Sequence, residues 1–322
     1  MVVRLTIRGK TLLHIGTSEN QRSPRSRVSV ADGKNIPYGW SWTTRKTLPS
    51  AGPGGGGRGD ELGAMTSFHI EIIKPSHYDK DGYVIQWWKA WIPSNSMASL
   101  YAIAQDCAER KVLGDGVAIE VDAYDEMKGR IPIEQIVRRI RQPGHKGLVC
   151  LVGVQSNQIP RAMVIARQFR AKGVAVAIGG FHVSGCVAML KELTPELKEA
   201  VDLGVILYAG EAEEHFDARL RDVHRGEARP IYKTMDDLPS LQEQTIPYLP
   251  RRLVARYDGV LSSFDAGRGC PFQCSFCTII DVQGRKSRYR SADDVERIVR
   301  GNASRGMPIR LHWAREHQPR DA

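Results

Sequence analysis

The sequence predicts an α/β fold built on a parallel, doubly wound sheet, and two observations carry this prediction. Between residues 65 and 228, five short β-rich runs alternate with helical patterns. Several of these runs are apolar at consecutive positions, which is typical of strands that helices cover on both faces of a sheet. Such alternation favours right-handed crossovers between parallel strands, and sheets of this kind bind ligands at the carboxyl ends of their strands.

The individual elements follow from the spacing of apolar residues. The first helix has a continuous apolar stripe, with Ser96 suited to cap its start and Gly114 to follow its end. The expected helices cover residues 97–108, 133–140, 162–169, 187–201 with a break at Pro195, and 212–223. The expected strands cover residues 70–73, 117–121, 148–154, 174–178 and 205–208, which makes residues 65–228 a five-stranded, Rossmann-like domain.

Residues 1–64 show no sustained period of 2 or 3.6, and they include the glycine run 54–57. This composition predicts disorder. Met65 precedes a strand-like run, so two interpretations stay open. The first 64 residues are either non-native upstream sequence or a genuine flexible extension.

Residues 229–258 are predicted to be a linker, because four prolines stand among polar residues there. A second domain, residues 259–322, is expected to begin with a strand over 260–264. Ser291 is expected to open a helix whose first turn carries acidic residues suited to the helix dipole. A further strand is expected over residues 309–313.

Composition argues against several classes of protein. The formal net charge is +10, but residues 1–64 contain ten Lys and Arg against four Asp and Glu, so +6 of the excess lies in that segment. The remainder is mildly basic, which argues against nucleic-acid binding. No apolar run is long enough for a membrane span, and the N-terminus lacks a signal-peptide core. We therefore expect a cytoplasmic protein.

Three of the six cysteines lie within eight residues, as Cys270, Cys274 and Cys277, with the spacing Cys-x3-Cys-x2-Cys. Disulfide pairing among them would leave an odd thiol, whereas thiolates are suited to iron–sulfur clusters. Three ligands on one loop leave the fourth iron of a [4Fe-4S] cluster open to a substrate. A zinc loop is the alternative, but it requires a fourth ligand.

This cysteine loop resembles that of the radical S-adenosylmethionine (SAM) superfamily, and residues 283–291 resemble the segment that follows the loop in members with an N-terminal cobalamin-binding domain. The resemblance implies that the open iron chelates S-adenosylmethionine and that Phe276 packs over the cluster or the adenine. It also implies an external electron donor such as flavodoxin or ferredoxin.

The resemblance extends over residues 66–300 and implies that the parallel domain holds cobalamin. Its expected contacts are Ser156, Gly179, Gly180 and Gly210, which follow the third, fourth and fifth predicted strands. The Asp-x-His-x-x-Gly motif that donates a cobalt ligand in many cobalamin domains is absent. Any cobalamin is therefore expected without a histidine ligand, and neither His77 nor His182 is assigned as one.

The family resemblance implies methyl transfer as the parent activity, with radical rearrangement as the other possibility. One strand-helix unit and residues 309–313 follow the cysteines, so we expect an incomplete radical SAM (β/α) barrel, and an inactive fragment is an open interpretation. A second alternative is a methylthiotransferase, which would hold another cluster on Cys107, Cys150 and Cys186. The sequence does not identify the substrate.

Overall fold

The computed structural model describes residues 66–87, 90, 92–257 and 263–307, together with the backbone of two strands near the N-terminus. The chain divides into two compact units, Met1–Gly59 and Asp60–Ala322. In the first unit, β1 (Arg4–Ile7) and β2 (Lys10–His14) pair antiparallel. These short strands differ from the predicted disorder of residues 1–64, and the rest of that segment lies outside the described residues.

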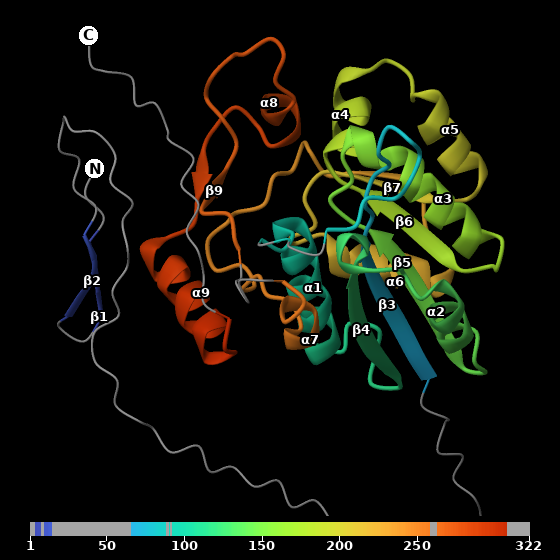
Figure 1. The fold of residues 1–322 in the computed structure, drawn as a ribbon, viewed down its shortest axis with the longest axis horizontal. Coiled ribbons are helices and arrows are strands. Elements are labelled where there is room, and N and C mark those ends of the chain that lie inside the picture. Colours follow the sequence, from blue (N-terminus) through green and yellow to red (C-terminus); the bar gives the residue numbers. More distant parts are fainter. Residues whose placement is uncertain are drawn as a thin grey trace, which may run out of the picture. The chain divides into compact units, whose positions relative to one another are not determined.

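Six parallel strands form the sheet of the second unit, in the order β4-β3-β5-β6-β7-β8 (Figure 1). The chain passes from β3 to β4 on one side and then to β5 on the other, so the order reverses between β3 and β5. The predicted five strands correspond to the first five of this set, and β8 was missed. The strands are β3 (Thr66–Lys74), β4 (Val117–Asp125), β5 (His145–Leu151), β6 (Ala175–Gly179), β7 (Ile206–Ala209) and β8 (Ile231–Lys233).

Helices cover both faces of the sheet. One face packs against α1 (Asn95–Glu109) and α6 (Phe216–Arg225). The other packs against α2 (Ile133–Ile140), α3 (Ile159–Arg170), α4 (Phe181–Met189) and α5 (Pro195–Asp202). The break predicted at Pro195 within residues 187–201 is confirmed, since Pro195 starts α5. The first helix of this region, α4, begins earlier than predicted, directly after Gly180.

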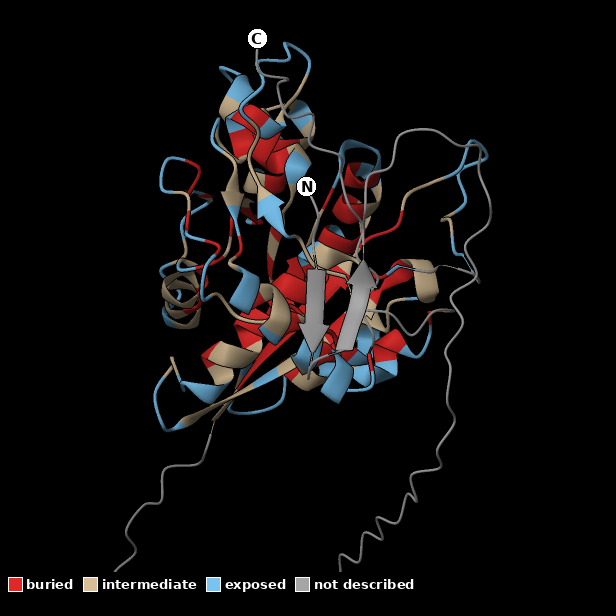
Figure 2. Ribbon diagram, turned by 90° about the vertical axis from the view of Figure 1, so that its left-hand side faces the viewer, coloured by how far each residue is buried: buried red, intermediate tan, exposed pale blue. Residues whose placement is uncertain are grey.

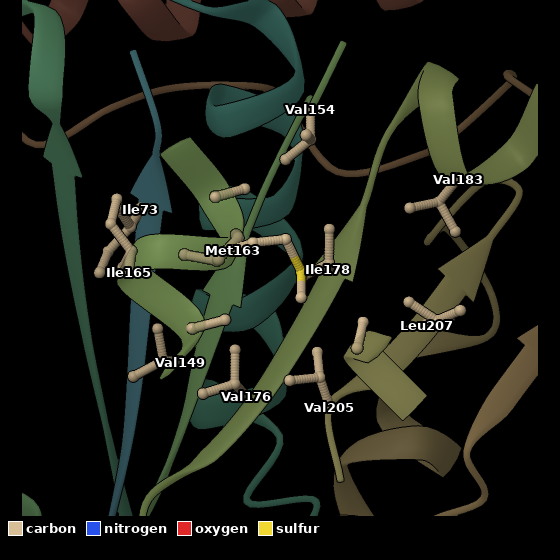
Figure 3. Packing of buried hydrophobic residues seen from close by; sticks show 14 of the residues in the cluster. Ile73, Val149, Val154, Met163, Ile165, Val176, Ile178, Val183, Val205 and Leu207 are labelled. Carbon is tan, nitrogen blue, oxygen red and sulfur yellow. The ribbon is translucent and has the colours of Figure 1, made fainter. Parts of the chain in front are cut away.

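The core on the α2 and α3 face is packed mainly with valine, isoleucine and leucine side chains and with Met163 (Figure 3). Val149, Val176 and Ile178 of the strands meet Met163 and Ile165 of α3 there. Burial is concentrated in the sheet and on the inner faces of the helices (Figure 2). No helix among the described residues is both long enough and apolar enough to cross a membrane.

The segment predicted to be a linker is packed against the sheet. It contains β8, which pairs with β7, and α7 (Arg251–Val254). Leu253, Val254 and Tyr257 are buried in the core on the α1 face. Apolar residues between the prolines pack into this core, and the proline content of the sequence did not distinguish a packed segment from a linker.

The C-terminal elements are short except for the last helix. They are β9 (Gly267–Arg268), α8 (Ile279–Val282), β10 (Arg288–Tyr289) and α9 (Ala292–Ser304), and β9 pairs antiparallel with β10. Ser291 caps α9, as predicted, through a capping box with Asp294. Residues 260–262 and 309–313 lie outside the described residues, and Ser263 and Phe264 are not in a strand.

Candidate cofactor-binding site

A cavity of about 310 Å³ lies against the α1 face of the sheet, between α1 and α6. Its floor is formed by β5, β6 and β7 toward their carboxyl ends. The segment that carries the three cysteines completes its wall, since the cavity is also lined by Asp265, Gly267, Arg268, Val282 and Gln283. The cavity therefore joins the parallel sheet to the flanks of the cysteine loop.

Small side chains on the sheet create this space. Cys150, Ala177 and Gly179 all line the cavity and project little from their strands. On the opposite face of the sheet β6 carries Val176 and Ile178, which fill the core on the α2 and α3 face. The alternation of small and branched residues along β6 is visible in the sequence, whereas the prediction of the site used only the glycines at the end of that strand.

The glycines that follow the strands are required by the backbone. Gly180 has φ +142°, and a Cβ added there would lie 2.2 Å from the backbone nitrogen of Val154. Gly210 has φ +118°, and a Cβ there would lie 2.3 Å from the hydroxyl of Thr234. Both positions therefore exclude larger residues through contacts within the chain, apart from any ligand.

The structure brings together three of the five residues predicted to contact a cofactor. Gly179, Gly180 and Gly210 line the cavity, whereas Ser156 and Phe276 are absent from its lining. The Ser156 hydroxyl bonds to Nδ1 of His182 at 3.1 Å. Phe276 is 87% exposed.

His182 also lies 3.4 Å from a carboxylate oxygen of Glu196 on α5. Its partners thus come from the α3 and α5 face. Among the described residues that line the cavity there is no histidine.

The cavity contains buried polar atoms that lack partners within the described chain. Asn95 Oδ1, Ser99 Oγ and Arg219 Nε are all shielded from solvent, all without a hydrogen-bond partner, and all belong to residues that line the cavity. A buried polar atom without a partner costs free energy. A mostly apolar cavity with a few such atoms therefore fits an organic cofactor that has polar groups.

A network of buried charges joins the end of β7 to the segment before the cysteines. Arg268 donates to Glu211 at 2.8 Å and to Glu213 at 2.7 Å, and these side chains are 11%, 6% and 5% exposed. Arg288 also donates to Glu211, at 3.0 Å, and to the backbone oxygen of Pro239 at 2.7 Å. The network holds both strands of the β9–β10 pair against the carboxyl edge of the sheet.

Asp265 extends this network to α1. It accepts from Arg268 at 2.6 Å and from the side chain of Asn95 at 2.9 Å, and Arg290 lies 3.6 Å away. Burial opposes ionisation of Asp265, but Arg268 and Arg290 more than offset it and lower the pKa of this carboxyl. The sequence did not reveal these residues as a network, because nothing in it pairs positions more than fifty residues apart.

The three cysteines lie on one partly exposed loop. Cys274 is exposed, Cys270 and Cys277 are half-buried, and the backbone N–H of Cys277 donates to the oxygen of Cys274 at 3.1 Å. No three His, Cys, Asp or Glu side chains within the described ranges are placed to hold a metal ion together. The donor set fits an iron–sulfur cluster in its chemistry, since it consists of three free cysteines on one loop.

The other cysteines differ in their surroundings. Cys107 lies in α1, Cys150 in β5 and Cys186 in α4. Burial raises the pKa of Cys107 to about 11 and that of Cys150 to about 12. Such thiols are poor metal ligands and poor nucleophiles at neutral pH. The placement does not favour the methylthiotransferase interpretation.

The fold and the cavity define a class of protein, an α/β domain with a cavity beside a cysteine loop, and we compared the chain with known proteins. No family model matches the chain. It is 31% identical to bacteriochlorophyllide d C-8(2)-methyltransferase of Chlorobaculum tepidum over 146 residues, which are 44% of this chain and 30% of that protein. It is 28% identical to the hopanoid C-2 methylase of Rhodopseudomonas palustris over 132 residues, which are 41% and 23% of the two chains.

Solved structures of the radical S-adenosylmethionine methyltransferase TsrM from Kitasatospora setae, one of them with cobalamin and a [4Fe-4S] cluster bound, are 13% identical, with a TM-score of 0.41. This match covers 74% of the present chain and 47% of TsrM. The chain spans less than a third of the length of the curated relatives named above. The two curated relatives are named as a methyltransferase and a methylase, and the predicted family resemblance is confirmed to that extent.

Proposed function

We propose that this chain is the cobalamin-binding and cluster-binding part of a radical SAM methyltransferase. The observation that carries the proposal is that one cavity is walled both by the parallel sheet and by the residues flanking Cys270, Cys274 and Cys277. Two cofactors that act together would thus be bound by adjoining segments of one compact unit.

The residues divide between the two cofactors. The cavity would take the tail of cobalamin, with Gly179, Gly180 and Gly210 at its opening. The three cysteines would ligate a [4Fe-4S] cluster and leave one iron for S-adenosylmethionine. When bound, cobalamin supplies methyl-group transfer, and the reduced cluster supplies the electron that cleaves S-adenosylmethionine.

The chain itself would position the two cofactors and exclude water from the cavity. The apolar side chains of α1 and α6 shield the cavity, and the charge network of Arg268 with Glu211 and Glu213 holds the cysteine segment beside it. Phe276, exposed on the same loop, is available to cover a cluster or an adenine ring.

Cobalamin binding by the full chain tests the first half of the proposal. We expect hydroxocobalamin to bind, and Ala177→Leu to weaken binding at least tenfold, because leucine would fill the floor of the cavity. Thermal unfolding should show that the variant keeps the stability of the unmodified chain, since it fills empty space. Equal affinity of the variant and the unmodified chain would contradict this placement.

Anaerobic reconstitution tests the second half. The chain should take up about four irons and show a broad thiolate-to-iron absorption band. Cys270→Ala, Cys274→Ala and Cys277→Ala should each abolish the band, whereas Cys107→Ala is the control that retains it. Loss of the band in Cys107→Ala as well would instead support the methylthiotransferase interpretation.

The interpretation of this chain as an inactive fragment is tested by the same preparation. We expect bound cofactors without steady formation of 5'-deoxyadenosine under reducing conditions. Sustained cleavage of S-adenosylmethionine that disappears in Cys274→Ala would contradict it.

A further inference from the structure

Arg219 is a cation in the cavity wall without an anionic partner in the described part of the chain. Its guanidinium carbon lies 4.7 Å from the centroid of the Tyr232 ring, and both residues line the cavity. Within those described residues Arg219 forms no salt bridge, and its Nε has no hydrogen-bond acceptor. By contrast, Arg221 on the same helix pairs with Asp217 at 3.3 Å and donates to the backbone oxygen of Val112 at 3.1 Å.

The carboxylates that line the cavity do not pair with Arg219, and Asp265 among them accepts from Arg268. Glu211 and Glu213 both line the cavity, but their oxygens accept hydrogen bonds from Arg268 and Arg288. Arg219 is partly buried and its Nε is shielded from solvent, so leaving that N–H without an acceptor costs free energy. The planar donor groups of the guanidinium match the oxygens of a phosphate or a carboxylate.

Two neutral polar groups accompany this cation. Ser99 is 8% exposed, and neither its hydroxyl nor Oδ1 of Asn95 has a partner among the described residues. A ligand that satisfies the cavity therefore offers an anionic group together with neutral donors and acceptors. This description fits a nucleotide, with its phosphate, ribose hydroxyls and base, better than a purely apolar group.

We propose that Arg219 binds the phosphodiester of a corrinoid's nucleotide tail, so that this cavity selects corrinoids that carry the tail over those that lack it. The inference rests on the proposed function, since it assumes that the cavity takes a corrinoid. It adds which chemical part of the cofactor is recognised and by which residue.

Equilibrium binding of cobalamin and of cobinamide, which lacks the nucleotide, tests the proposal with the full chain. The unmodified chain should bind cobalamin at least tenfold more tightly. Arg219→Met should weaken cobalamin binding by about ten- to a hundredfold, the value of a charge-assisted hydrogen bond, and should change cobinamide binding less than twofold. Arg221→Met is the matched control on the same helix and should leave both affinities unchanged.

A competition experiment needs no variant and covers the case in which Arg219→Met does not fold. The nucleotide α-ribazole 5'-phosphate should displace cobalamin at least tenfold better than α-ribazole, which has the same base and ribose. Equal competition by the two, or a preference for cobalamin that survives in folded Arg219→Met, would overturn the inference and leave the proposed function intact. If neither corrinoid binds the unmodified chain, the proposed function itself fails.

Discussion

At the scale of single residues, position in the fold decides what each group contributes. Gly180 shows this, because its predicted role was close approach to a ligand. The structure adds that the backbone of Val154 lies so close to Gly180 that any side chain at position 180 would collide with it. Gly180→Leu would therefore disturb the fold, and Ala177→Leu is the more specific test of the cavity.

Glu71 shows a different effect of position. It lies on β3, and its side chain is 1% exposed. One carboxylate oxygen of Glu71 lies 3.0 Å from a guanidinium nitrogen of Arg139, and the other oxygen has no partner among the described residues. Burial raises the pKa of Glu71 to about 7, and Arg139 offsets only part of this shift.

The raised pKa predicts how stability changes with pH. Because Glu71 holds its proton more tightly in the folded chain, its contribution is fully present below its unfolded pKa of about 4.3. That contribution is lost as pH rises to about 7. We expect this group to lower the free energy of unfolding by on the order of 3 kcal/mol across that window. Denaturant unfolding at several pH values should show that Glu71→Gln removes this slope.

The control for this experiment is Glu134→Gln, which changes an exposed carboxylate on α2, the helix that carries Arg139. It should keep the pH dependence of the unmodified chain. A slope that persists in Glu71→Gln would assign the dependence to other groups.

At the scale of elements, the β9–β10 pair depends on charges contributed by the loop after β7. Arg268 and Arg288 are the buried cations of this contact, and Glu211 accepts from both. Buried pairs of this kind contribute little net stability but are costly to break, because the remaining charge stays buried without its partner. The docking of the cysteine segment is therefore sensitive to a single carboxylate.

Glu211→Gln should loosen that segment selectively. Arg268 keeps Glu213 and Asp265, so we expect a loss of on the order of 2 kcal/mol rather than the full cost of a broken pair. Hydrogen exchange should quicken in residues 263–307 while β3 and β5 keep their protection. Glu214→Gln, which alters an exposed neighbour, is the control, and uniform protection in both variants would show that the network does not hold the segment.

At the scale of the whole molecule, the boundary between the two compact units falls just before the first strand of the large sheet. The first unit ends at Gly59, and β3 begins at Thr66. Residues 229–258, in contrast, contribute β8 and buried side chains to the second unit, so no boundary falls there.

Limited proteolysis should follow this organisation. Cleavage is expected first before residue 66, because a junction between units is more accessible than a packed strand. The product should retain the sheet through β8, and it should bind hydroxocobalamin with the affinity of the full chain. A protected fragment beginning near Met1, identified by mass spectrometry, would contradict the prediction.

The sequence by itself determined the features that depend on near neighbours. Apolar runs predicted five of the six strands of the large sheet, and the capping role of Ser291 was visible in its own turn. The cluster chemistry of the three cysteines stays a prediction from their spacing. The sequence did not distinguish β8 from a linker, because a three-residue strand is stabilised by its partner β7 rather than by its own pattern.

The tertiary structure alone decided the composition of the cavity wall. Arg219, Ser99 and Tyr232 carry no local motif, and they become a candidate site only where α1, α6 and β8 meet. The pairing of Arg268 with Glu211 and Glu213 likewise joins positions more than fifty residues apart. Such contacts arise where distant elements pack together. Packing depends on the shapes of the elements and on which residues they bury, and neither can be read from the order of residues along the chain.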